Sequence, residues 1–214
     1  MKIQLTADGS STIYIPELDE HYHSVNGAVQ ESRHVFLNAG FNLCTKGKIQ
    51  VLELGFGTGL NALLTAIEAE KRKIQVHYIT LEKYPLTENV LNQLNYSELD
   101  ENLCEKIHRA EWEKEVSISP FFSIQKIQTD FSDYTFPDLY DVVYYDAFAP
   151  DKQAEVWTQD LFDRIARQMN SEAILTTYCA KGAIRRMMQA AGLSVERIPG
   201  PPGKREMLRA RKLC

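Results

Sequence analysis

Short apolar runs alternate with segments of helical periodicity along most of the chain. Runs rich in β-branched and aromatic residues predict seven strands, at residues 49–54, 76–81, 121–127, 139–145, 173–178, 193–198 and 206–210. Between them, apolar positions recur at helical spacing and predict helices at 60–71, 87–94, 102–113, 154–169 and 181–191. Repeated strand–helix units indicate an α/β fold, with a largely parallel seven-stranded sheet covered by helices on both faces. Only a Gly-Pro-rich loop joins the last two strands, so the last strand should run antiparallel.

The first 45 residues follow a different pattern. Two alternating runs, 3–6 and 12–15, flank a turn at Asp8-Gly9 and predict a hairpin. Apolar residues at helical spacing then predict a helix at 27–43. We therefore expect an N-terminal hairpin-and-helix extension, residues 1–45, followed by an α/β domain at 46–214.

The composition is that of an ordinary globular protein, with 44% hydrophobic and 25% charged residues. No apolar run approaches the roughly 20 residues that span a bilayer, and the N-terminus lacks the apolar core of a signal peptide. We expect a cytoplasmic protein without a membrane partner. Cys44, Cys104, Cys179 and Cys214 are far apart and form no Cys-x-x-Cys pair, so reduced thiols are expected.

Positive charge is concentrated at the C-terminal end of a chain whose net charge is −5. From residue 181 to residue 214, nine cationic residues accompany two anionic ones, which gives this segment a charge of +7. Such asymmetry indicates one basic face on an acidic body. A solvated surface segment is the simpler interpretation of the same pattern.

A glycine-rich turn follows the first strand of the predicted sheet. Gly55, Gly57 and Gly59 stand between that strand and a predicted helix, which opens with Leu60 and Asn61. Glycines at such a turn let the backbone approach a ligand closely, and the first amides of the helix face that ligand. The strand–turn–helix context favours a nucleotide-binding loop over a plain tight turn.

Acidic residues near this turn narrow the class of ligand. Glu53 precedes the glycines, and Glu82, next to Lys83, ends the second strand, where a carboxylate can accept both hydrogens of a ribose diol. Asp130 follows the third strand, where it can receive an adenine amino group while Phe131 packs on the base; a turn Asp is the alternative. The spacing Gly-x-Gly-x-Gly differs from that of dinucleotide enzymes, and no P-loop lysine is present. An acidic loop favours cationic S-adenosylmethionine, with a nicotinamide dinucleotide as the second possibility.

The fourth strand ends in a candidate acceptor site. Asp146 lies at its carboxyl end, and Phe148 and Pro150 form a rigid apolar wall beside it, an arrangement that resembles the Asp-Pro-Pro-Tyr loop of amino-methylating enzymes. An alkylammonium must lose a proton before it can accept a methyl group, and a carboxylate in reach can orient the amine and take that proton. An aromatic ring beside it can stack on a base. The alternative is that Asp146 caps the next helix, although Asp151 is nearer to its start.

With these residues in place, the chain resembles the methyltransferase domain of the MnmC family of bacterial tRNA wobble-uridine enzymes, which some bacteria carry alone as MnmD. The matching segments include ELGFGTGLN at 53–61, DLYDVVYYDAFAP at 138–150, TYCAKGAIRRMM at 177–188 and PGPPGKREML at 199–208. The resemblance implies a class I, Rossmann-like methyltransferase with S-adenosylmethionine as donor. It implies the primary amine of 5-aminomethyl(-2-thio)uridine in the anticodon loop as acceptor, with the family's motif Asp at Asp146 and Phe148 beside it.

One departure from the family concerns its second domain. MnmC carries an FAD-dependent oxidoreductase domain that generates the amine, and these 214 residues contain no second glycine-rich dinucleotide loop. By resemblance, we expect methylation alone, with no obligatory protein partner. The family's N-terminal part packs over the cofactor crevice, so His21, His23 and lid residues near Glu31 are expected close to it.

The basic segment gains a role from this resemblance. We expect phosphates of the anticodon stem-loop to contact cationic side chains of the helix at 181–191 and of the Gly-Pro loop, with one tyrosine facing the pocket. The candidate substrate-binding residues are Tyr178, Lys181, Arg185, Arg186, Lys204 and Arg205. The target base must be splayed out of the loop toward Asp146.

Other functions remain as alternatives. A methyltransferase for a small-molecule or protein amine has no use for a basic surface. A nicotinamide-dependent oxidoreductase is disfavoured by the glycine spacing, and an RNA-binding relic by the intact loop and Asp146. No metal site is expected, because His21 and His23 lack a third and fourth ligand nearby.

Overall fold

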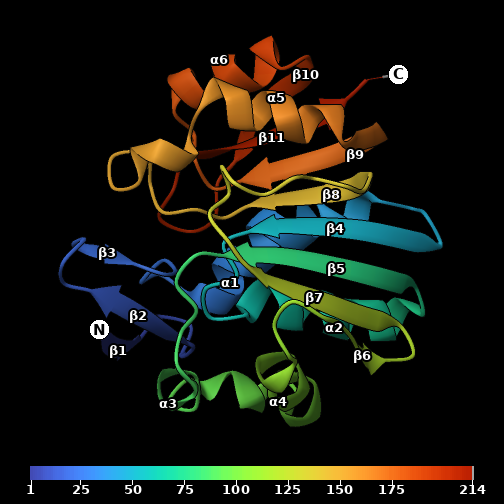
Figure 1. The fold of residues 1–214 in the computed structure, drawn as a ribbon. Helices are drawn as coiled ribbons and strands as arrows, with labels where there is room; N and C mark the ends of the chain where they lie inside the picture. Colours follow the sequence, from blue (N-terminus) through green and yellow to red (C-terminus); the bar gives the residue numbers. More distant parts are fainter. Residues whose placement is uncertain (214) are drawn as a thin grey trace.

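A computed structural model describes residues 1–213, so Cys214 lies outside the described residues. In this part of the chain, one large sheet is formed by β4 (Lys48–Leu54), β5 (Gln75–Glu82), β6 (Glu115–Ser119), β7 (Phe122–Gln128), β8 (Tyr140–Tyr145), β9 (Met169–Thr177), β10 (Leu193–Pro199) and β11 (Glu206–Lys212). The strand order is β10-β11-β9-β8-β4-β5-β7-β6 (Figure 1). The five central strands are parallel, whereas β11 and β6 pair antiparallel with their neighbours. The predicted α/β fold, with its antiparallel last strand, is confirmed.

Helices cover both faces of this sheet, as predicted. They are α1 (Ala28–Ser32), α2 (Leu60–Arg72), α3 (Glu88–Leu91), α4 (Glu101–Arg109), α5 (Gln159–Arg167) and α6 (Gly182–Ala190). Alternate residues of the buried strands face opposite sides, so Val51 and Tyr144 pack in one core with α2 and α4. Leu52 and Tyr145 pack in the other core with α5 and α6. The parallel strands are therefore apolar on both faces, which explains their continuous apolar sequence.

A small antiparallel sheet precedes the large one, with β1 (Lys2–Leu5), β2 (Ser11–Ile15) and β3 (Glu20–His21). The predicted hairpin is confirmed, and β3 adds a third strand. This sheet lies beside the carboxyl ends of β4 and β5 (Figure 1). It is anchored by Tyr96, whose hydroxyl donates to the Ser11 carbonyl oxygen over 2.7 Å. The division into two domains at residue 45 stays a prediction.

Several elements of the structure differ from the prediction. The helix expected at 27–43 continues from α1 as a π-helix (Arg33–Asn38) and ends before Gly40, where a Cβ would lie 2.6 Å from the Phe36 carbonyl oxygen. The helix expected at 154–169 begins at Gln159, because the Thr158 hydroxyl accepts the Leu161 amide as its N-cap. The edge strand β6 was missed, because its residues are mostly polar and half-exposed. None of the described helices is long and apolar enough to cross a bilayer.

Candidate active site

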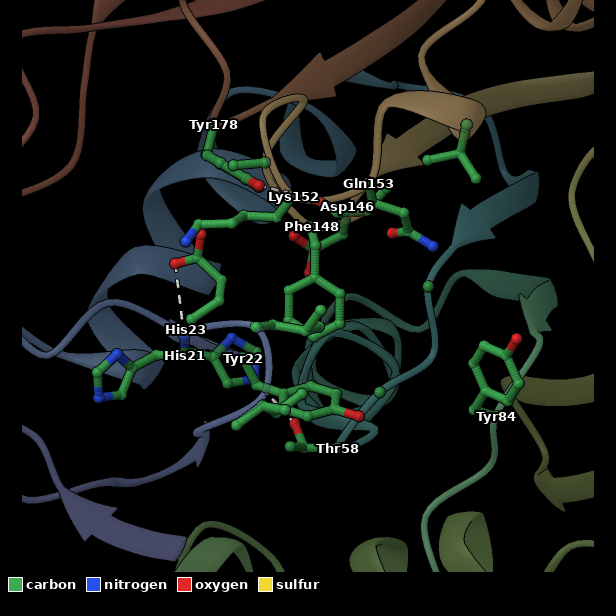
Figure 2. Close-up of a pocket in the computed structure, with 18 of the residues that line it drawn as sticks. His21, Tyr22, His23, Thr58, Tyr84, Asp146, Phe148, Lys152, Gln153 and Tyr178 are labelled. Carbon is green, nitrogen blue, oxygen red and sulfur yellow. Dashed lines mark hydrogen bonds between the residues drawn. The ribbon is translucent and has the colours of Figure 1, made fainter. Parts of the chain in front are cut away.

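A cavity of about 660 Å³ opens at the carboxyl ends of the central strands. The loop after β8 supplies one wall, and the segment that contains β3 closes it from the other side. Figure 2 shows Asp146, Phe148 and Tyr178 on one side, facing His21, Tyr22 and His23. The rings of Tyr22 and Phe148 meet edge to face at 5.1 Å, so the two walls touch through aromatic side chains.

The glycine turn brings two loops into contact. Gly55 has a φ of +99°, and a Cβ there would lie 2.5 Å from the backbone oxygen of Asp146. The turn after β4 and the loop after β8 thus pack backbone to backbone, which only glycine permits. Gly57 has a φ of +50°, and a Cβ there would lie 2.9 Å from the Tyr22 ring. The glycines are required for close packing around the cavity as well as for the turn itself.

Glu82 is held in a fixed orientation by two backbone amides. Its Oε2 accepts the Gly57 amide at 3.0 Å, and its Oε1 accepts the Tyr84 amide at 2.9 Å. Each oxygen keeps a second lone pair, and the side chain lines the cavity. This geometry suits a carboxylate that receives two adjacent hydroxyl groups.

Asp130 is fixed and ionised beside Glu82. Its Oδ2 accepts a hydrogen bond from Lys83 at 2.7 Å, and its Oδ1 accepts both the amide and the hydroxyl of Ser132. The hydrogen bond from Lys83 is the main cause that lowers the pKa of Asp130 to about 2. Three of roughly four lone-pair positions are thereby used, which leaves room for one further donor.

Asp146 is the half-buried carboxylate of the opposite wall. Its Oδ2 accepts the side-chain amide of Asn61 at 2.8 Å. Burial raises the pKa of Asp146 to about 7. Asp146 does not cap a helix, since Thr158 caps α5. A carboxyl group with a pKa near neutrality can both hold and release a proton at physiological pH.

Behind Asp146 lies a second carboxyl group, Glu53. The same Asn61 nitrogen donates to Glu53 Oε1 at 3.0 Å, and the Thr80 hydroxyl donates to Oε2 at 2.7 Å. Glu53 has no exposed surface, and burial raises its pKa to about 8. Glu53 is therefore mainly protonated at neutral pH, so the two carboxyl groups do not both carry a charge.

A profile of the S-adenosyl-L-methionine-dependent methyltransferase family matches residues 88–213. The chain belongs to this family. Among its relatives is the "tRNA 5-methylaminomethyl-2-thiouridine biosynthesis bifunctional protein MnmC" of Cupriavidus metallidurans, 32% identical over 97% of this chain and 33% of that protein. The protein of the same name from Marinomonas sp. is 30% identical over 89% of this chain and 31% of its own length. The chain thus spans about a third of the length of these curated relatives.

Solved structures agree with this assignment. The crystal structure of MNMC2 from Aquifex aeolicus matches this methyltransferase with a TM-score of 0.81 and 25% identity, over 99% of this chain and 70% of that one. Spermidine synthase from Thermotoga maritima, at 13% identity and a TM-score of 0.60, shows the fold alone.

The cavity of this methyltransferase fits S-adenosylmethionine, the donor of its family. The ligand-facing groups include the fixed carboxylate of Glu82, the ionised Asp130 and the nearby ring of Phe131. An acidic lining favours a ligand with sulfonium and ammonium charges. No group of three or more His, Cys, Asp or Glu residues in the described chain is placed to hold a metal ion.

The predicted donor-binding residues divide into two groups. Seven line the cavity: Gly55, Gly57, Glu82, Lys83, Asp130, Phe131 and Asp146. The other four lie behind its wall: Glu53, Gly59, Leu60 and Asn61. Contact with the donor stays a prediction for both groups, and the four residues behind the wall support the lining residues by hydrogen bonds and packing.

The predicted substrate-binding residues also divide. Tyr178 lines the cavity, and its hydroxyl donates to the Ala147 carbonyl oxygen at 2.8 Å. Lys204, expected with Arg205 to contact phosphates of the anticodon stem-loop, lines the cavity, where its Nζ lies 2.7 Å from Glu31 Oε1. Lys181 pairs with Asp151 outside the cavity.

The two histidines lie at the cavity, as the resemblance implied. The Nε2 of His23 bonds the Thr58 hydroxyl at 2.8 Å. Burial lowers the pKa of His23 to about 4, so the ring is neutral. The sequence analysis missed Tyr22, Lys152 and Gln153, which also line the cavity. An aromatic residue between two histidines was the available signal for Tyr22.

We predict that Glu53→Gln makes the protein more stable at pH 8 and leaves its stability at pH 4 nearly unchanged. The pKa of Glu53 is raised in the folded state, so the wild-type protein loses stability as pH rises from about 4.5 to about 8. Because each unit of pKa shift corresponds to about 1.4 kcal/mol, the gain at pH 8 should exceed that value. Urea unfolding of the variant and the wild type at pH 4 and pH 8 measures the difference in unfolding free energy. The exposed Glu98→Gln is the control, and a loss of stability at pH 8 in Glu53→Gln would contradict the account.

Proposed function

We propose that this methyltransferase transfers the methyl group of S-adenosylmethionine to the primary amine of 5-aminomethyl(-2-thio)uridine at the wobble position of tRNA. The product is 5-methylaminomethyl(-2-thio)uridine. The observation that carries the proposal is Asp146, half-buried on the wall of the cavity that contains the glycine turn, with a pKa of about 7. The names of the relatives support the choice of acceptor.

The donor would be held by the wall opposite the N-terminal segment. Glu82 receives the ribose hydroxyls, and Asp130 receives the adenine amino group while Phe131 packs on the base. When bound, S-adenosylmethionine supplies an electrophilic methyl group on a sulfonium. The glycines at 55 and 57 let the turn pack against the loop after β8 and against Tyr22, which form the walls around this space.

Asp146 prepares the acceptor amine. An alkylammonium has no lone pair, so it must transfer a proton before it reacts. Asn61 holds Asp146 Oδ2, and within the described chain Oδ1 has no protein hydrogen bond, which leaves it to orient the amine and accept its proton. Phe148 and Tyr22 form an aromatic wall on which the splayed pyrimidine can stack.

Arginines outside the cavity would hold phosphates of the anticodon stem-loop. Arg186 and Arg197 converge at the start of α6, since a Cβ on Gly182 would lie 3.3 Å from Arg186 Nη1 and 4.0 Å from Arg197 Nη2. Arg186 and Arg205 are exposed, and Arg185 is partly exposed. Such contacts position an RNA without reading its sequence.

We predict that Asp146→Asn lowers the rate of methyl transfer to tRNA by about 10²–10⁴-fold, because an amide cannot accept the proton. Donor affinity should change little, since the asparagine oxygen can still accept from Asn61. Single-turnover transfer of a labelled methyl group and calorimetric binding of the donor measure the two effects. Asp160→Asn, the same substitution on the exposed side of α5, is the control. An unchanged rate in Asp146→Asn would remove Asp146 from the mechanism.

We predict that Arg186→Glu combined with Arg205→Glu raises the KM for tRNA by about tenfold or more, with kcat and donor affinity retained. The dependence of binding on salt should weaken, because fewer phosphate contacts release fewer counterions. Lys106→Glu, at an exposed position of α4, is the control. An unchanged KM for tRNA would remove Arg186 and Arg205 from the proposed phosphate contacts.

A further inference from the structure

Lys204 is a charged residue of the cavity that the proposed mechanism does not use. Its Nζ lies 2.7 Å from Glu31 Oε1 and 4.0 Å from the centre of the Tyr178 ring. The other oxygen of Glu31 accepts the Ser24 amide at 2.7 Å, and the Glu31 side chain is only 9% exposed. The Tyr178 hydroxyl in turn bonds the carbonyl oxygen of Ala147, the residue after Asp146. A continuous set of contacts therefore connects Lys204 to the acceptor end of the cavity.

The position of Lys204 is fixed by the packing of the loop that carries it. Gly203 has a φ of +86°, and a Cβ there would lie 2.0 Å from the side-chain nitrogen of Asn26. The Lys204 amide donates to the Pro201 carbonyl oxygen at 2.9 Å, and His34 Nε2 bonds the Pro199 carbonyl oxygen at 2.8 Å. The Gly-Pro loop is thus packed against the N-terminal segment, so Lys204 is held over the cavity.

Several titratable groups surround the Lys204 ammonium. They come from the N-terminal sheet, the first helix, the loop after β8 and the end of β9: Asp8, Glu20, His23, Glu31, Arg33, His34, Asp146, Lys152, Tyr178 and Cys179. His23 is neutral because burial lowers its pKa to about 4. Asp146 responds to both members of the ion pair: Glu31 raises its pKa and Lys204 lowers it.

The positive charge of Lys204 affects the protonation of an amine bound in the cavity. The acceptor enters as an ammonium and reacts only as a neutral amine. A fixed cation nearby repels the protonated form and so favours loss of the proton, as with catalytic lysines next to another cationic group. The same cation favours the ionised form of Asp146, which is the form that accepts the proton.

We propose that Lys204, held by Glu31 and Tyr178, is a positioning residue that places a positive charge at the acceptor end of the cavity, so that the amine is bound in its neutral, nucleophilic form. This inference rests on the proposed function. The proton leaves the amine nitrogen for Asp146 Oδ1, and Lys204 keeps its own proton throughout. Glu31 fixes the ammonium, and Lys204 in turn opposes the charge of Glu31, whose effect on Asp146 is the larger of the two.

The two partners of the ion pair should change the pH profile in opposite directions. Lys204→Met removes the cation. The acidic limb of the single-turnover pH–rate profile should therefore shift to higher pH by about one pH unit. Glu31→Gln leaves the cation without its counter-charge, so the acidic limb should shift to lower pH. Lys204→Arg should keep the wild-type limb, and Lys106→Met, an exposed position, is the matched control. A purely structural role for the pair would lower the rate at every pH without moving the limb, and that result would overturn the proposal.

A titration without substrate separates this inference from the proposed function. The carboxyl carbon of Asp146, assigned with Asp146→Asn, is followed by NMR in the wild type, Lys204→Met and Glu31→Gln. The pKa of Asp146 should rise in Lys204→Met and fall in Glu31→Gln. An Asp146 pKa that moves in neither variant would overturn the inference, whatever the acceptor. A wild-type enzyme that methylates no tRNA amine, but shows both shifts, would refute the proposed acceptor and leave the electrostatic role of Lys204 standing.

Discussion

The candidate active site depends on one side-chain amide that serves two carboxyl groups, one fully buried and one half-buried. Asn61, at the start of α2, donates to Glu53 on β4 and to Asp146 after β8, at 3.0 and 2.8 Å. Burial is the main cause that raises the pKa of Glu53 to about 8 and that of Asp146 to about 7. Glu53 holds its proton, and Asp146 is left able to exchange one near neutral pH. The Asn61 side chain thus connects a buried residue of the sheet, Glu53, to the carboxylate that lines the cavity, Asp146.

The cavity itself is assembled from segments that are far apart in the chain. The glycine turn and the loop after β8 touch at Gly55, and the N-terminal segment closes the space through Tyr22. The Gly-Pro loop near the C-terminus reaches the same space through Lys204, which pairs with Glu31. These segments pack so closely at their glycines that an added Cβ would clash. Substitutions in the N-terminal segment should therefore disturb the acceptor end as strongly as substitutions in the large sheet.

Local sequence patterns predicted the fold and several of the residues that line the cavity. The apolar strands and the glycine turn are readable because their periodicity and conformational needs are local, and Gly55, Gly57, Glu82 and Asp146 lie where strand ends place them. The π-helix and the polar edge strand β6 had no such local signal. Lys204 was expected to contact tRNA phosphates, because it belongs to the basic C-terminal segment. Its pairing with Glu31, 173 residues away, is a tertiary contact that no spacing reveals.

The most direct measurement follows a methyl label from donor to nucleoside. The protein is incubated with methyl-labelled S-adenosylmethionine and tRNA that carries unmethylated 5-aminomethyl-2-thiouridine, and the digested nucleosides are identified by mass spectrometry. The account predicts label in 5-methylaminomethyl-2-thiouridine and in no other nucleoside. Donor binding without any labelled tRNA, or label on a different nucleoside, would contradict it.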